Sequence, residues 1–380
     1  MITENDKPIH TADPKKKRHS EDRIHPVALI LLGIALLSLV IIIIARNNMA
    51  FADFFNSHVS SKIRAFLALL TNWIPFSLAE LLILLLPFLL LGIIVYAIRR
   101  KSKTWRGVLS YFVSLLSAVS VIFSLFALSF GVGYYVPSLD TKLNLTQDNV
   151  STEDLRDTAL WLSEEIATLT PDIYFTSDGS SAMPYSLSEM NDKLMDAYRS
   201  LCEKYGFLQK LNSNIKPVMI SVGMSYAHLT GIYTFFTGES NLNIDFPDYT
   251  LPFTAAHELA HQRGIARENE ANFIAFLACV ESDDPYLRYS GYLNLYEYVV
   301  TALYSADKAV YKNVRSYLPE CANGEMRAYS AFYDKYRNSE AGKVNNAVNN
   351  AYLQANGATA GTKSYGMVVD LAVAYFRSSD

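Results

Sequence analysis

The chain has 380 residues, enough for two or three structural units. Hydrophobic residues make up 51% of it, and the mean hydropathy of +0.11 is high for a soluble protein. The net charge of −4 gives no sign of a nucleic-acid partner. The apolar residues concentrate in the first third of the chain, and the remainder has the composition of an ordinary globular domain.

Three apolar segments follow a basic tail, residues 1–25, that we expect to be disordered. The segments are 27–45, 81–98 and 107–135, and each is long enough to span a bilayer. The first is not a cleaved signal peptide, because its apolar core is too long and no small-residue cleavage site follows it. Residues 26–136 are therefore predicted to form three transmembrane helices, and the outer loop within them, 51–73, to lie as a helix on the membrane surface.

The distribution of Lys and Arg predicts the orientation. The tail and the loop after the second span are rich in both residues, whereas the loop after the first span has only Arg46, Lys62 and Arg64. The positive-inside rule then puts the tail in the cytoplasm and everything after the third span on the opposite side. We expect a multi-pass protein of the cell membrane, with the lipid bilayer as a partner and residues 137–380 as an extracytoplasmic domain.

The predicted extracytoplasmic domain is mainly helical with a small sheet, an α+β fold. Ser151 followed by Asp154 indicates the start of a helix. Apolar residues at helical spacing predict helices over 153–168, 187–211, 286–311, 341–354 and 364–376. Two further segments, 217–224 and 241–246, have the composition or alternation of strands. The three cysteines show no CxxC spacing, which disfavours a cysteine zinc site.

The segment His257-Glu258-Leu259-Ala260-His261 is an HExxH pattern. On a helix, positions four apart lie one turn apart on the same face, offset by about 40°. Two imidazoles placed in this way can bind one metal ion, and the Glu between them can reach a water beside the metal. The pattern therefore predicts His257 and His261 as ligands of a catalytic zinc ion and Glu258 as the general base.

A catalytic zinc site needs a third protein ligand, which must be His228 or a carboxylate. Glu268 would lie about 10 Å further along the axis than His261 if the helix continued unbroken, too far to share its metal. Gly264 is placed to end the helix and reverse the chain. A second helix could then return a Glu to the metal, and Glu268 and Glu270 are both candidates, about 200° apart around that helix.

The spacing Glu268-x-x-Ala271-Asn272 resembles the ExxA(D/N) motif of the gluzincin peptidases. That resemblance implies that Glu268 is the zinc ligand and that Glu270 is a surface or supporting group. The runs 237–241, 251–264 and 268–279, together with 73–77 and 134–145, are similar to a bacterial family of membrane-anchored zincins known only as a domain of unknown function. This resemblance implies a zincin-like domain in a membrane zinc peptidase without an established substrate.

These residues favour a zinc-dependent peptidase acting on a peptide or protein. Glu258 would move the proton, the segment 241–246 could be an edge strand that pairs with substrate, and His228 and Tyr233 are candidate oxyanion donors. The alternative is a zinc-stabilised receptor or scaffold that binds peptides or wall fragments without cleaving them. Cleavage inside the bilayer is excluded, because the charged residues around the pattern do not fit hydrocarbon. The oligomeric state is not predicted.

Overall fold

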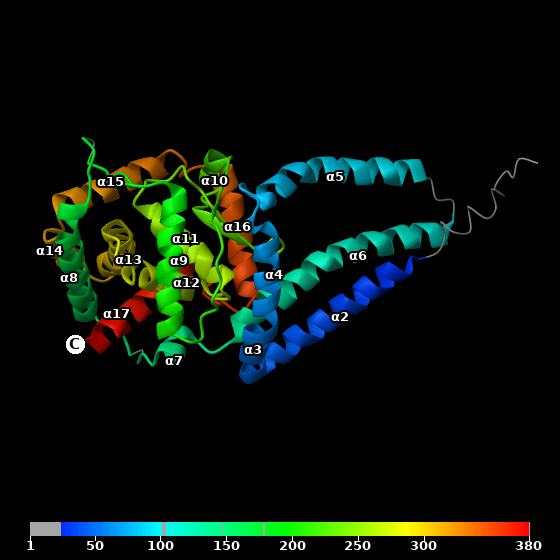
Figure 1. Cartoon of the computed structure of the whole chain (residues 1–380), viewed down its shortest axis with the longest axis horizontal. Coiled ribbons are helices and arrows are strands. Elements are labelled where there is room, and N and C mark those ends of the chain that lie inside the picture. Colours follow the sequence, from blue (N-terminus) through cyan, green and yellow to red (C-terminus); the bar gives the residue numbers. More distant parts are fainter. Residues whose placement is uncertain (1–23, 101–103, 147, 178, 380) are drawn as a thin grey trace, which may run out of the picture.

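The computed structural model describes residues 24–100, 104–146, 148–177 and 179–379. Long helices extend from one side of a globular part, which contains most of the chain (Figure 1). The basic tail predicted to be disordered lies outside the described residues, apart from its last two positions. The architecture is mostly helical with one small sheet, in agreement with the coarse fold class predicted from the sequence.

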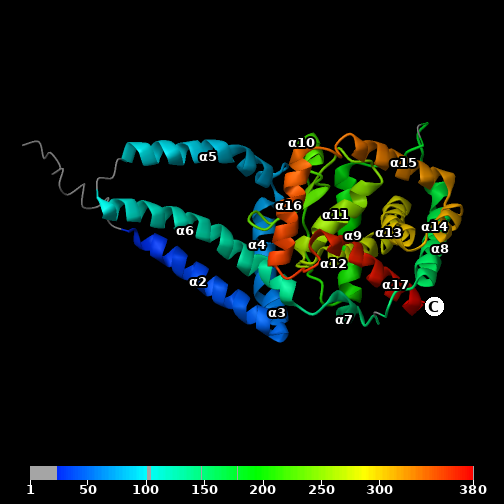
Figure 2. The same ribbon diagram turned by 180° about the vertical axis from the view of Figure 1, so that it is seen from behind.

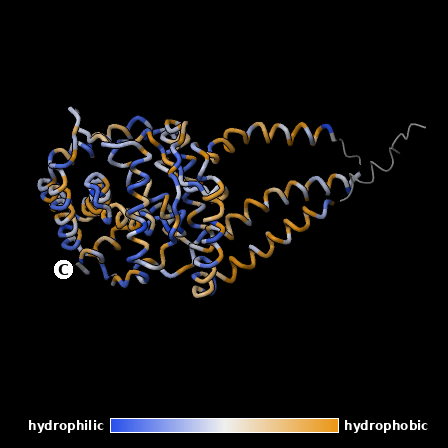
Figure 3. The backbone as a smooth tube through the Cα atoms, viewed as in Figure 1, coloured by the Kyte–Doolittle hydropathy of each residue, from blue (hydrophilic) through white to orange (hydrophobic). Residues whose placement is uncertain are grey.

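Three helices are long and apolar enough to cross a membrane: α2 (Pro26–Asn47), α5 (Leu78–Arg100) and α6 (Trp105–Ser129). Their apolar character stands out against the mixed globular part (Figure 3). Helices α2 and α6 pack along each other. Helix α5 stands apart from them in both views (Figures 1 and 2). These helices confirm the three apolar segments predicted from the sequence.

The third apolar helix is shorter than predicted, because α6 stops at Ser129 and a 3₁₀ helix, η2 (Gly131–Tyr135), follows. Within η2, Gly133 lies against a turn of the globular part. A Cβ atom added there would lie 3.1 Å from Ala266 Cβ and 3.2 Å from the Gly264 carbonyl oxygen. The glycine therefore lets the chain leave the helix axis and pack closely, a contact that hydropathy does not encode.

The loop between the first two apolar helices forms α3 (Met49–Phe55), a π-helical turn η1 (Asn56–Ser60) and α4 (Ser61–Asn72). Helix α4 runs across the ends of α2 and α6 (Figure 1). One side of α4 is buried, and the other exposes large apolar side chains, namely Phe66, Leu69, Leu70 and the following Trp73. This two-sided character suits the predicted location on the membrane surface, which stays a prediction.

The globular part contains eleven of the helices in the described ranges. They are α7 (Leu139–Leu143), α8 (Thr152–Leu169), α9 (Leu187–Lys204), α10 (Ser221–Tyr226), α11 (Thr250–Gln262), α12 (Glu268–Val280), α13 (Pro285–Ala306), α14 (Lys308–Arg315), α15 (Glu320–Asp334), α16 (Glu340–Ala355) and α17 (Val368–Ser379), with 3₁₀ turns η3 (Thr170–Asp172) and η4 (Gly361–Met367). Helices α11, α12 and α13 lie at the centre of the main hydrophobic core. The predicted helix start at Ser151 is confirmed, because its side chain and that of Asp154 form a capping box.

The sheet has three short strands, β1 (Lys216–Pro217), β2 (Gly231–Thr234) and β3 (Glu239–Leu242), in the order β1-β3-β2. Strand β1 is parallel to β3, and β2 is antiparallel to it, with Tyr233 opposite Ser240. Strand β3 is therefore central, and β2 has a free edge. Because β3 ends at Leu242 and has neighbours on both sides, the prediction that 241–246 forms an edge strand is wrong.

The predicted strand over 217–224 is also wrong, because β1 ends at Pro217 and helix α10 begins at Ser221. The Glu80 carboxylate accepts hydrogen bonds from the backbone N–H groups of Met219 and Ile220, at 3.0 and 2.8 Å. An anion is favourable at a helix start, so this distant residue stabilises a helical turn in a β-prone sequence. Tertiary contact overrides local propensity here.

Buried polar contacts join the apolar helices to the globular part. Arg64 on α4 donates to Asn56 Oδ1 (2.9 Å) and to the Ser129 carbonyl (2.8 Å), and its guanidinium lies against Gly264. Glu239 on β3 accepts hydrogen bonds from two backbone N–H groups in the first turn of α5, at 3.1 and 2.9 Å. The predicted boundary near residue 137 is thus crossed by buried interactions, and experiments on the globular part should use the full chain.

Candidate metal centre

Helix α11 places the HExxH side chains deep in the globular part. All thirteen of its residues are buried, so the helix is held by core packing on every side. The rings of His257 and His261 lie one turn apart on the same face, with centroids 4.6 Å apart. The helix and the shared face are those that the HExxH spacing predicts.

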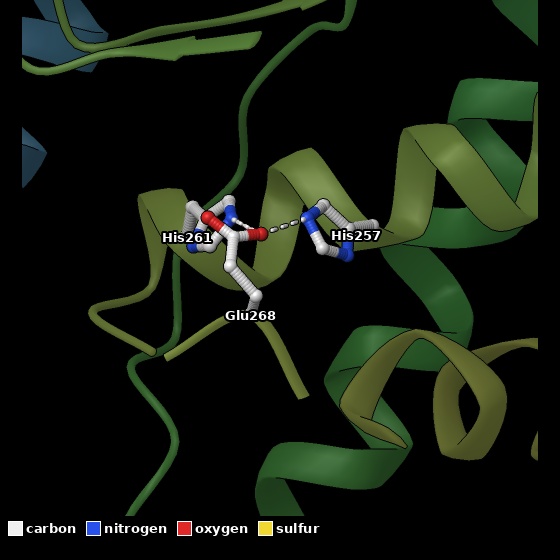
Figure 4. Close-up of side chains that lie close together, drawn as sticks. All are labelled: His257, His261 and Glu268. Carbon is white, nitrogen blue, oxygen red and sulfur yellow. Dashed lines mark ion pairs between the residues drawn. The ribbon is translucent and has the colours of Figure 1, made fainter. Parts of the chain in front are cut away.

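Gly264 ends α11 as predicted. Its φ of +98° is a left-handed conformation that glycine adopts without strain. The backbone N–H of Ile265 bonds to the Ala260 carbonyl (3.1 Å), which closes the end of the helix. Helix α12 then begins at Glu268 and packs against α11. The reversal brings Glu268 back to the two histidines (Figure 4).

The side chains of His257, His261 and Glu268 converge on one point. Oε2 of Glu268 lies 3.3 Å from His257 Nε2 and 3.4 Å from His261 Nε2, and the three ligand atoms lie within 4.8 Å of one another (Figure 4). A tetrahedral zinc ion with bonds of about 2.0–2.1 Å separates its ligand atoms by about 3.3–3.4 Å. The two short separations and the His–His–Glu donor set both fit a zinc ion.

Hydrogen bonding orients His261 toward that point. Its Nδ1 lies 2.7 Å from the Ile265 carbonyl oxygen, so Nδ1 carries a proton and the ring is oriented with Nε2 toward Glu268. His257 lacks such support, since its buried Nδ1 has no hydrogen-bond partner among the residues that the structure describes. The two ligands therefore differ in how firmly the protein orients them.

The electrostatics of the three side chains favour a positive charge between them. Burial lowers the pKa of His261, but the Glu268 carboxylate outweighs burial and raises this pKa to about 9. Burial alone would raise the pKa of Glu268, yet the two histidines hold it well below its ordinary value of 4.5. A cation among these groups would satisfy the same attraction as a shared proton.

Glu258 lies beneath strand β2, close to the two histidines. The backbone N–H of Tyr233 donates to its carboxylate, and burial raises the pKa of Glu258 above 4.5 although His257 and His261 oppose this. A Cβ atom added at Gly231 would lie 2.6 Å from Glu258 Oε1. The glycine thus allows the strand to pass directly over the carboxylate. The same cavity is lined by Glu258 and by the three candidate ligands.

The structure separates the two candidate glutamates. Glu270 Oε1 lies 2.7 Å from Arg267 Nη1 and accepts a hydrogen bond from the Leu139 backbone N–H at 3.0 Å. Arg267 also donates to the carbonyls of Tyr134 and Val136, at 3.0 and 2.7 Å. Glu270 therefore stabilises the segment that follows α6, through Leu139 and Arg267. It is not part of the His–His–Glu group. The geometry favours Glu268 as the third ligand.

His228 is separate from the His–His–Glu group. It has a positive φ of +56°, and its Nε2 lies 2.9 Å from the Tyr336 carbonyl oxygen. A Cβ atom added at Gly342 would meet its ring at 2.3 Å, so α16 packs directly on this histidine. His228 lines the cavity but serves mainly to hold helix α16.

The Tyr233 ring packs on Phe130, with centroids 5.4 Å apart. Its buried hydroxyl has no hydrogen-bond partner in the described part of the chain. Burial raises the pKa of this hydroxyl to about 12, although Arg64 opposes the shift. The hydroxyl therefore stays protonated, and Tyr233 lines the same cavity as His257, His261 and Glu268.

The His–His–Glu group forms one side of a cavity of about 910 Å³. Other walls come from the end of α6, from β2, α13 and α16. Two tyrosines in these walls were not singled out from the sequence, Tyr298 on α13 and Tyr352 on α16. Burial raises the pKa of both, and the Glu268 charge raises them further, so both hydroxyls lie near the His–His–Glu group. With 25 tyrosines in the chain, no local pattern distinguishes these two.

Together these features define a helical protein in which three helices are long and apolar enough to cross a membrane. A buried His–His–Glu group lies beside a cavity in its globular part. The chain belongs to the family described as "Protein of unknown function (DUF3810)", whose family model matches residues 55–373. The match includes α4, the two longer apolar helices after it and every residue of the candidate centre. Neither the curated proteins nor the solved structures give a match.

Proposed function

We propose that the protein is a membrane-anchored zinc-dependent peptidase. The observation that carries the proposal is the buried Glu258 carboxylate in the same cavity as the convergent side chains of His257, His261 and Glu268. A scaffold held by zinc needs the three ligands. It has no need of a second buried carboxylate, Glu258, beside them. Burial of a carboxylate costs free energy, and burial still raises the pKa of Glu258 although the Tyr233 N–H and the two histidines oppose this, so its presence favours a chemical role.

His257, His261 and Glu268 would hold the ion. A zinc ion supplies Lewis-acid chemistry, which acidifies water and polarises a carbonyl group. Glu258 would accept the proton of the attacking water and transfer it to the leaving amine. Its raised pKa makes it a better proton acceptor than an exposed glutamate, and the backbone N–H of Tyr233 keeps it in place.

Two hydroxyls are candidates for stabilising the oxyanion. Tyr298 OH accepts a hydrogen bond from Asn272 Nδ2 (3.3 Å), and Tyr352 OH accepts one from Tyr134 OH (3.1 Å). Each hydroxyl therefore retains its own proton to donate. Because burial keeps both groups protonated, either can donate to developing negative charge in the cavity.

The substrate would be an extended peptide. The free edge of β2 borders the cavity, where Gly231 and Ile232 line the wall, so a peptide could add to the sheet there as a further strand. The cavity-lining residues that the structure describes include no Lys or Arg. Nothing in this lining would pair with the carboxylate of a peptide C-terminus, which favours cleavage away from that end.

The test uses the purified full chain. Bound zinc and hydrolysis of a broad peptide library are measured for the wild type, Glu258→Gln and the surface control Glu281→Gln. We expect zinc in all three proteins and loss of cleavage, by about 10²-fold or more, in Glu258→Gln alone. Zinc without cleavage by any of the three would favour the receptor or scaffold. A folded wild type that binds no zinc would overturn both the peptidase hypothesis and the zinc-stabilised receptor or scaffold hypothesis.

A further inference from the structure

Helix α16 has two opposite faces of different character. Gly342 and Leu353 are buried on the side that meets the globular part. Val344 and Val348, on the other side, are each 62% exposed. Exposed alanines lie on the same arc at positions 341, 347, 351 and 355, so the arc is apolar beyond the first turn.

Helix α16 lies on the side of the globular part from which the apolar helices extend (Figures 1 and 2). In both views α16 lies in the layer of the globular part nearest α5 and α6, as does α4 (Figures 1 and 2). At its C-terminal end, the Tyr352 ring packs on Phe126 in the last turn of α6, with centroids 5.9 Å apart. Since Gly342 and Leu353 face the globular part, Val344 lies on the opposite side of the helix, and Val348 lies between that side and the cavity, whose rim it helps to form.

We propose that α16 lies on the bilayer surface, with Val344 and Val348 in contact with lipid, so that one wall of the cavity is membrane-bound. The surface is continuous with the apolar helices through the contact between Tyr352 and Phe126. Helix α16 resembles α4 in this respect, because α4 also buries one face and exposes large apolar side chains on the other.

The apolar area of this face is small, so α16 would need the apolar helices to hold it at the membrane. Two valines and several alanines offer little apolar surface, so this arc would bind a membrane only weakly on its own. The apolar helices hold α16 at the membrane, which makes its binding effectively intramolecular. A second copy of the chain is a less suitable occupant, because the narrow arc offers far less than the roughly 800 Å² per partner of a stable interface.

The location has a consequence for the site. Helix α16 also lines the cavity, through Asn345, Asn346, Val348, Asn349 and Tyr352, so the exposed arc and the cavity wall meet at Val348. Lipid contact on the exposed arc would therefore help to fix the position of this wall of the cavity. A substrate that enters the cavity past α16 would then be a segment of a protein that lies at the membrane surface. The lipid contact itself does not depend on the proposed peptidase activity.

The test places a nitroxide on the full chain in lipid nanodiscs, where both membrane faces are open to reagents. Labels go on Val344→Cys and Val348→Cys in a Cys321→Ser background, because the other two cysteines are buried. Ala309→Cys on α14, at the end of the molecule far from the apolar helices, is the aqueous control (Figure 1). Leu37→Cys within α2, 59% exposed, is the lipid control.

We expect labels at 344 and 348 to collide more often with oxygen than with a water-soluble nickel complex, as at 37, and the label at 309 to show the reverse. Labels at 344 and 348 that behave like the one at 309 would overturn the proposal. Dipolar broadening that disappears on dilution with unlabelled protein would also overturn it, by showing that a second copy covers the face. Circular dichroism of each variant checks that the fold is retained.

Discussion

Two walls of the cavity are built in contrasting ways. The wall formed by α11 and α12 lies within the core, and every residue of α11 is buried. The wall formed by α16 is largely exposed; Gly342 packs on His228 near one end, Tyr352 contacts Tyr134 and Phe126 near the other, and η4 packs against the helix. The candidate metal ligands thus belong to the rigid wall, where packing fixes their geometry, and the α16 wall is the more exposed of the two.

The strongest test of the rigid wall compares Glu268→Gln with Glu270→Gln. Loss of a direct ligand should weaken zinc binding by more than the about 10–100-fold typical of supporting residues, whereas Glu270→Gln should retain zinc. Glu270→Gln should instead lower stability by about 1.5–3 kcal/mol, because Leu139 and Arg267 lose a charged partner. Competition with a chelator and thermal unfolding measure the two effects. Equal zinc loss in both variants would contradict the assignment of Glu268.

The second test concerns the turn that joins α11 to α12. Gly264→Ala should destabilise the protein by about 2–4 kcal/mol, from left-handed backbone strain and from overlap with Arg64. The added Cβ would lie 2.3 Å from Arg64 Nη2. Gly206→Ala is the matched control, since nothing lies within 4 Å of a Cβ there and a change within about 0.5 kcal/mol is expected. Similar unfolding temperatures for the two variants would show that the turn is not constrained.

The third test addresses a buried acid between the two walls. Burial raises the pKa of Glu297 from 4.5 to about 7, although a hydrogen bond from Tyr249 opposes the shift. The folded state therefore holds this proton more tightly than the unfolded state, and stability decreases as the pH rises from 4.5 to about 7. Glu297→Gln should match the wild type near pH 4.5 and exceed it by on the order of 2 kcal/mol at pH 8. A stability difference that does not depend on pH would contradict this account.

The smallest effect is expected at the exposed wall. His228→Asn keeps a residue that tolerates positive φ but removes the ring on which Gly342 packs. We expect a loss of about 1 kcal/mol confined to α16, because the α16 wall is the more exposed of the two. Hydrogen exchange should become faster in α16 and stay unchanged in α11. Faster exchange in both helices would show that the two walls are coupled.

Several features of the candidate site were predictable because they depend on neighbours in the sequence. The HExxH spacing places His257 and His261 on one helical face, and Gly264 supplies the conformation that ends that helix. The apolar segments have the length of membrane-crossing helices, apart from the last residues of the third. The choice of Glu268 over Glu270 needed a motif resemblance, which the arrangement of the two side chains supports.

Other features depend on residues far apart in the chain. The sequence could not show that β3 is central and β2 is the edge strand, because sheet order is set by pairing between segments. Nor could it show that Glu80 favours a helix at Ser221 where β-branched residues indicate a strand. Tyr298 and Tyr352 become candidates only when α13 and α16 meet the metal centre across one cavity.

The sequence by itself determined the apolar helices, the helix that carries the two histidines and the turn that returns a glutamate to them, because periodicity, length and backbone preference act over short distances. Only the tertiary structure decided which glutamate faces the histidines, which strand has a free edge and which helix covers the cavity. Those outcomes depend on how the elements pack and on which buried polar groups find partners, and no short segment contains that information.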